Sequence, residues 1–223
     1  MNKEIISPIL LSLRVATVAT FFTLIVGVFL SWLFARKKFP GKDVIEALIL
    51  LPMVLPPSVV GYLLLIFFGK RGPMGIFLEN TFGFSVIFTW IACTIGSFVV
   101  SLPLMYQNCK SAFTSVDTRY EDAARTLGAS GWRIFTKVTV PLAWPGIVSG
   151  FILSFARALG EFGATMMIAG NIPGKTQTIP IAIYFAVEIG DTRKANILMG
   201  IVLTFGYILI FSLNKWLKTK RMN

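Results

Sequence analysis

Long apolar stretches separated by short polar segments dominate the pattern of residues along the chain. Crossing the hydrocarbon core of a bilayer as a helix takes about 20 apolar residues, and five stretches reach or approach this length. The pattern predicts an all-α, polytopic membrane helix bundle that forms one transmembrane domain over residues 1–223, with no room for a soluble catalytic domain. The expected spans are residues 10–35, 44–68, 84–106, 142–169 and 195–213.

A sixth apolar run, residues 179–189, is too short to cross a bilayer easily. Pro180 stands at its start and Glu188 near its end. We therefore expect a re-entrant or interfacial helix on the outer side of the membrane. The first apolar run of the chain is too long for a signal peptide and lacks a cleavage site of small residues, so we expect it to be the first span.

Composition supports a membrane protein and excludes several other classes. Hydrophobic residues make up 55% of the chain and charged residues 14%, whereas soluble domains carry about a quarter charged residues. In a soluble protein the net charge of +11 would suggest nucleic-acid binding. Here the basic residues lie at the ends of apolar runs, so we expect no nucleic-acid partner. The chain has no histidine, and Cys93 and Cys109 lack metal-ligand spacing, so we expect no metal site and interpret both cysteines as structural.

The positions of lysine and arginine predict the orientation of the bundle. Thirteen of the 21 basic residues fall into three groups, at residues 36–42, 110–137 and 215–221. With five spans all three groups lie on one side of the membrane, which the positive-inside rule identifies as cytoplasmic. The N-terminus is then outside and the C-terminus is in the cytoplasm. A sixth span at residues 179–189 would place the basic C-terminal tail outside, which argues against such a span.

A charged segment between the third and fourth spans, residues 118–141, contrasts with the apolar sequence around it. Thr118 and Glu121 have the spacing of a capping box at the start of a helix. Gly128 supplies the positive φ that ends a helix, and Ser130 can cap a second short helix. This unit either docks a partner on a small apolar face or lies on the lipid headgroups at the inner membrane surface. The small apolar face consists of Ala123, Ala124 and Leu127.

The fourth expected span contains two ionisable residues, Arg157 and Glu161. Because charges are costly in hydrocarbon, both are expected to face the interior of the bundle. Their spacing of four residues places them on one helix face, where they can pair. The pair either stabilises the packing or lines the translocation path. Phe162 and Gly163 follow directly and are further candidates for the path or its gate.

Prolines interrupt the second expected span. Pro52, Pro56 and Pro57 remove donors from the hydrogen-bond ladder of a helix. Kinks within a membrane are tolerated where the freed carbonyl groups find partners or line a cavity. The segment is therefore either a hinge or part of the path, or it serves packing alone. Pro56 and Pro57 join the candidates for the gate.

The 118–141 segment resembles the EAA loop of bacterial ABC-importer permeases, whose pattern is close to E-A-A-x-x-x-G-x9-I-x-L-P. Asp122 stands where the family has Glu, and Glu121 is one residue earlier, so the residues leave open which acid contacts the partner. The resemblance implies a coupling helix, within a loop at about residues 110–141, that seats in a groove of a cytoplasmic ATP-binding subunit. The implied coupling residues are Glu121, Asp122, Ala123, Ala124, Leu127 and Gly128, with Val138, Val140 and Pro141 at the I, L and P positions.

Four motifs together resemble the molybdate-type branch of these permeases. They are the basic turn at residues 36–42, L-P-x-x-L-P-P at 51–57, A-R-T-L-G-A-S at 124–130 and A-R-A-L-G-E-F-G-A at 156–164. The branch transports molybdate, and often tungstate, delivered by an extracytoplasmic oxyanion-binding protein. The related sulfate/thiosulfate permeases share much of the pattern and are the alternative.

The resemblance also implies the assembly and its location. Two copies of the permease would form the path together with two cytoplasmic ABC ATPase subunits, in the cytoplasmic membrane of a bacterium or archaeon. ATP and Mg²⁺ would bind to the ATPase. This chain would bind no cofactor and catalyse no reaction, and it has no G-x-x-x-x-G-K-[ST] motif.

Two other classes of function fit the residues less well. A secondary transporter would need coupling-ion residues within the membrane and usually internal repeats, and the chain has one clear ionisable pair and no visible repeat. A membrane enzyme would need a cluster of catalytic side chains in its spans, and the pattern contains none.

Overall fold

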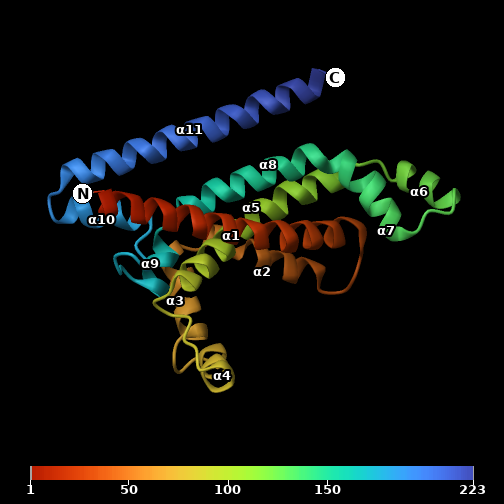
Figure 1. Cartoon of the computed structure of the whole chain (residues 1–223). Helices are drawn as coiled ribbons and strands as arrows, with labels where there is room; N and C mark the ends of the chain where they lie inside the picture. Colours follow the sequence, from red (N-terminus) through yellow and green to blue (C-terminus); the bar gives the residue numbers. More distant parts are fainter. Residues whose placement is uncertain (1, 223) are drawn as a thin grey trace.

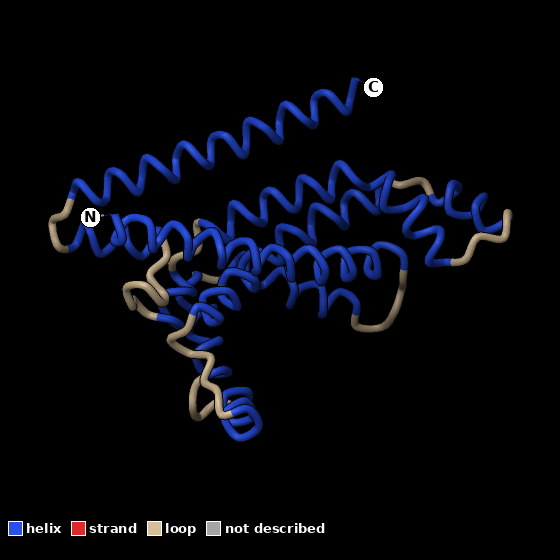
Figure 2. The backbone as a smooth tube through the Cα atoms, in the orientation of Figure 1, coloured by secondary structure: helices blue, strands red, loops and turns tan. Residues whose placement is uncertain are grey.

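The computed structural model describes residues 2–222, and every regular element in this part of the chain is a helix (Figure 1, Figure 2). The expected all-α fold is therefore confirmed. The elements are α1 (Asn2–Arg36), α2 (Lys42–Val54), α3 (Pro57–Phe68), α4 (Pro73–Phe82), α5 (Trp90–Ser115), α6 (Thr118–Thr126), α7 (Gly131–Ile134), the π-helix η1 (Phe135–Thr139), α8 (Val140–Leu159), α9 (Gly163–Ala169), α10 (Ile179–Glu188) and α11 (Thr192–Met222).

Four stretches of helix in the described residues are long and apolar enough to cross a membrane, and the number is five if one bent pair of helices counts as a single span. The four are α1, α5, the run from α7 to α8, and α11. The bent pair is α2 and α3, whose axes differ by 117°. The expectation of about five spans agrees with these four to five candidates, and the second expected span is broken between Val54 and Pro57, where its prolines lie. The short helix α10 is apolar but has only 10 residues, as its length in the sequence indicated.

Several helix boundaries differ from the expected spans, and the last helix, α11, is longer at both ends than the expected residues 195–213. The first helix begins at residue 2 rather than 10, because the polar residues at its start continue the helix. The third begins at Trp90 rather than at residue 84, since the Thr89 side chain caps it. The fourth expected span consists of two helices, because α8 ends at Leu159 and α9 begins at Gly163.

The centre of the bundle is formed by α1, α5 and α8, and the packing of α5 against α1 and α8 is the most extensive between helices. Small residues let these helices approach closely. A Cβ atom placed on Gly27 would lie 2.7 Å from Met105 Cγ, and one on Gly146 would overlap Ala112 Cβ. Hydroxyl groups also bridge the helices, as where Ser31 Oγ donates to the Tyr106 carbonyl at 2.9 Å. Close contact and buried hydrogen bonds therefore hold the three spans together.

The two ends of the bundle differ. The start of α1 and helix α10 lie at one end, whereas α6, α7 and the end of α11 lie at the other (Figure 1). The turn between α1 and α2 also lies at the α6 end (Figure 1). All three basic groups of the sequence therefore gather at one end of the molecule, as the five-span topology requires.

Candidate functional site

The start of α6 differs from the expected capping box. Asp117, not Thr118, is the cap, and its Oδ1 accepts a hydrogen bond from the Arg119 backbone N–H at 2.9 Å. The predicted role of Thr118 was therefore wrong, because the backbone is extended at Asp117 and already helical one residue later. The Arg119 guanidinium also bonds to the Asp117 carboxylate at 2.8 Å. These bonds hold the pKa of Asp117 below its usual value.

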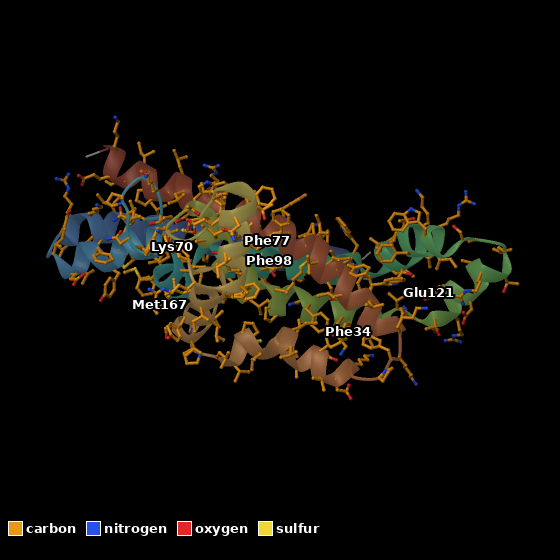
Figure 3. All side chains as sticks on the ribbon, turned by 90° about the horizontal axis from the view of Figure 1, so that it is seen from below. Phe34, Lys70, Phe77, Phe98, Glu121 and Met167 are labelled. Atoms are coloured by element: carbon orange, nitrogen blue, oxygen red, sulfur yellow. The ribbon has the colours of Figure 1, made fainter. Side chains whose placement is uncertain are left out.

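Glu121 turns into the protein instead of reaching back to the helix start. Its Oε1 accepts hydrogen bonds from Arg36 Nη2 at 2.7 Å, Arg36 Nε at 3.0 Å and Thr139 Oγ1 at 2.8 Å. Glu121 is 8% exposed, and Figure 3 shows it in the region where α6 approaches the end of α1, which carries Phe34. The carboxylate is therefore occupied within the chain and is not presented on the surface.

The neighbouring acid, Asp122, lies on the surface. It forms an ion pair with Arg125 at 2.7 Å, and both side chains are about two-thirds exposed. Ala123 is exposed, Ala124 is half-buried, and Leu127 is 88% exposed. The surface that the sequence suggested for docking is thus exposed, and it combines apolar side chains with the ion pair of Asp122 and Arg125. Tyr120 of α6 and Trp132 of α7 are also exposed, at 60% and 74%.

The turn after α6 has the expected form. Gly128 has a φ of 80°, a conformation that costs residues with a Cβ atom. The Gly128 and Ala129 N–H groups donate to the carbonyls of Arg125 and Ala124, both at 3.0 Å. Ser130 caps α7 by accepting from the Arg133 N–H at 3.4 Å. The helix, glycine turn and second helix predicted for residues 118–141 are confirmed.

A π-helical segment, η1, joins α7 to α8 and was not predicted. Pro141 has no N–H and cannot donate to the carbonyl of residue 137, while the Val140 N–H donates to the Phe135 carbonyl, five residues earlier. Such widened turns occur mostly as single turns and often at functional sites. Pro141 was the available signal in the sequence, although a proline alone does not specify a π-helix.

The second candidate site lies at the break between α8 and α9. Arg157 Nη1 and Glu161 Oε2 are 2.7 Å apart, so the expected ion pair is present. The two residues do not share a helix face, because α8 ends at Leu159 and Glu161 lies beyond it. Glu161 Oε1 instead accepts from the Ala164 N–H at 2.7 Å and thereby caps α9. With 2% exposure, Glu161 is among the most buried charged residues described.

The breaks in the second and fourth spans meet in space, because α3 packs against α9. A Cβ atom on Gly163 would lie 2.8 Å from Pro57 Cβ, and one on Gly61 would lie 2.8 Å from the Ala164 carbonyl oxygen. Pro56 stands directly before α3 as its cap residue. Phe162 faces α10, with its ring centroid 5.3 Å from that of Tyr184.

All six gate candidates, Pro56, Pro57, Arg157, Glu161, Phe162 and Gly163, therefore lie at or beside one junction. Figure 3 shows that this junction and the α6 region lie well apart: Met167 of α9 marks the junction, and Glu121 marks the α6 region. Among residues 2–222, no three side chains of His, Cys, Asp or Glu come close enough together to hold a metal ion.

Sequence reasoning missed two members of the α6 region. Arg36 was interpreted only as a basic residue at the end of the first span, and Thr139 was not singled out. Their link to Glu121 joins residues 85 and 18 positions apart. No periodicity or motif connects positions at such distances, so only the folded structure reveals the cluster.

Comparison with known proteins identifies the family of the chain. A family model described as "Binding-protein-dependent transport system inner membrane component" matches residues 6–222. The chain belongs to this family. It is 44% identical to the molybdenum transport system permease protein ModB of Escherichia coli (strain K12), over 94% of this chain and 91% of that protein. It is 34% identical to the sulfate transport system permease protein CysT of the same organism, over 96% of this chain and 76% of that protein.

Solved structures share the fold. A structure of the MetNI methionine ABC transporter in an inward-facing conformation aligns with a TM-score of 0.73 and 16% identity, over 96% of this chain and 95% of that one. The family and the fold together establish a multi-pass membrane protein of the binding-protein-dependent transport systems.

Proposed function

We propose that this chain is the membrane permease subunit of an ATP-driven importer of molybdate, with tungstate as a close analogue of the substrate. The observation that carries the proposal is the exposed face of α6, which stands at the basic end of a helix bundle related to molybdenum permeases. The lower identity to the sulfate permease favours molybdate over sulfate. The chain itself would carry out no chemistry.

In the proposed assembly, two copies of the chain surround the path and two cytoplasmic ATPase subunits bind to their α6 faces. One bundle of five spans is small for a gated path, which favours two copies around a two-fold axis. ATP and Mg²⁺ would bind to the ATPase, and an extracytoplasmic protein would deliver the oxyanion. The start of α1 would lie outside and the end of α11 in the cytoplasm, in accord with the basic α6 end.

Leu127→Asp tests the docking face. The Leu127 side chain is 88% exposed, so a carboxylate there is tolerated by the free permease but is costly once a partner covers it. Losing one apolar contact of about 2 kcal/mol corresponds to roughly a thirtyfold weaker complex. We expect the variant to insert normally, to co-purify with little ATPase, and to show little molybdate uptake in proteoliposomes that contain the binding protein.

Thr219→Asp is the matched control, because it adds the same charge to an exposed position near the end of α11. It should bind ATPase and transport molybdate as the wild type does. Wild-type uptake by Leu127→Asp would contradict docking at this face. Transport by the purified chain without ATPase, or transport of sulfate and not molybdate by the complete system, would contradict the proposed function itself.

A further inference from the structure

One ion pair of the α6 region differs from its neighbours. The pairs Asp117–Arg119 and Asp122–Arg125 join residues two and three positions apart, and their side chains are largely exposed. The pair Arg36–Glu121 joins α6 to the last residue of α1, and its side chains are 14% and 11% exposed. Among the ion pairs of the described residues, it is the one that ties α6 to a membrane span.

The same carboxylate also reaches a third segment. Thr139 Oγ1 donates to Glu121 Oε1, and Thr139 is the last residue of η1, directly before α8. Arg36 Nη2 additionally donates to the Val116 carbonyl in the turn between α5 and α6, at 3.2 Å. We call Arg36, Glu121 and Thr139 the Arg36 cluster. It connects α1, α6 and the start of α8 at one point.

The placement of the cluster matters because α8 reaches from one candidate site to the other. Its 20 residues begin beside Thr139 and end at the break that holds Glu161. A helix of this length extends for about 30 Å. A displacement of the start of α8 therefore reaches the junction of α3 and α9 through one continuous element. Only the π-helical turn, whose hydrogen bonds are less regular, separates α8 from α7.

Burying a charged pair needs a compensating role or good geometry, because removing both ions from water is costly. Here one carboxylate oxygen accepts three hydrogen bonds, two of them from the planar fork of a guanidinium. That geometry restricts the direction of the contact as well as its distance. It is suited to holding α6 in one orientation relative to α1 and α8.

We propose that the Arg36 cluster transmits the movement of α6 to the spans, so that ATPase motion reaches the α8–α9 break. Arg36, Glu121 and Thr139 act here as positioning residues and do not contact the ATPase or the substrate. The ATPase docks on the exposed face of α6, which carries Ala123 and Leu127. The movement is transmitted through its buried face, which carries Glu121. This inference rests on the proposed function, since it presupposes an ATPase on α6.

Charge reversal separates transmission from docking. In reconstituted complexes, Arg36→Glu should leave ATPase binding intact, because Tyr120, Ala123 and Leu127 remain exposed. The number of ATP molecules hydrolysed per molybdate transported should rise about tenfold, which lies within the range of coupling effects from single side chains. Restoring the pair in the double variant Arg36→Glu/Glu121→Arg should bring this ratio back toward the wild-type value.

A second variant covers the case in which Arg36→Glu does not fold. Arg36→Lys keeps the charge but cannot form the two-pronged contact with Glu121, so we expect a rise of about threefold in the same ratio. A purely structural cluster would lower the yield of assembled complex and leave the ratio of ATP to molybdate unchanged. That result, or a double variant no better than the single one, would overturn the proposal.

The wild-type complex distinguishes the two levels of inference. If it fails to transport molybdate, the proposed function is wrong. If it transports molybdate and both Arg36 variants keep its ratio of ATP to molybdate, the proposed function stands and the role of the Arg36 cluster is wrong.

Discussion

Glu121 and Glu161 are both buried acids paired with arginine, but they serve different parts of the fold. Glu161 pairs with Arg157, four residues away, and caps α9, the next helix in the chain. Glu121 pairs with Arg36, 85 residues away, and with Thr139 of η1. The first acid closes a break within one expected span, whereas the second ties three separate segments together.

The difference shows how a membrane bundle uses costly charges. At the α8–α9 break, Glu161 compensates for a local defect, since the first N–H groups of α9 lack helical partners. In the α6 region, Glu121 replaces extensive apolar packing, because α6 is largely polar and has few buried residues. We therefore expect loss of Glu161 to impair folding. Loss of Glu121 should instead loosen the orientation of α6 relative to α1 and α8.

The largest effect is expected at the local acid. Glu161→Leu leaves Arg157 without its partner and the Ala164 N–H without its acceptor. Removing one partner of a buried ion pair costs about 3–5 kcal/mol, and the lower end applies here because the Arg157 side chain is 31% exposed. The yield of folded protein in detergent and its thermal midpoint should both fall strongly. Glu161→Gln, which can still accept from Ala164, should be less damaging. A Glu161→Leu protein as stable as the wild type would show that the pair is not needed for folding.

An intermediate effect is expected where the two broken spans meet. Gly61→Ala places a Cβ atom 2.8 Å from the Ala164 backbone, which must shift. Overpacking of this kind costs about 1–3 kcal/mol. The matched control is Gly206→Ala in α11, where a Cβ atom has no neighbour within 4 Å. Thermal unfolding should separate the two variants. Equal thermal midpoints for the two variants would mean that the junction of α3 and α9 accommodates the extra methyl group without loss of stability.

The smallest effect on stability is expected at the acid beside Glu121. Asp122→Asn removes an exposed ion pair with Arg125, and such pairs contribute about 0–1 kcal/mol. The thermal midpoint of the free permease should hardly change. Glu121→Gln, measured in parallel, should lower it clearly, because the buried Arg36 loses its counter-ion. Reversal of this order would contradict the assignment of Glu121 to the inner face and Asp122 to the outer face of α6.

Much of the architecture was predictable because its determinants are local. Apolar length indicated five spans, basic residues indicated a common end, and Gly128 and Ser130 indicated a turn and a second helix. The capping box failed at Thr118 because Asp117, one residue earlier, is an equally good cap. The ion pair of Arg157 and Glu161 was expected from their spacing, although not the helix break between them.

By itself, the sequence determined the helical spans, their approximate number and the segment that stands out from the membrane, since apolar length, caps and glycine act within short stretches of chain. The tertiary structure decided which side chains of those helices contact one another. It turned Glu121 inward to Arg36, left Asp122 outside, and brought Gly163 against Pro57. The physical reason is that a buried charge or a close backbone approach depends on which distant segment fills the neighbouring space, and no local pattern specifies that neighbour.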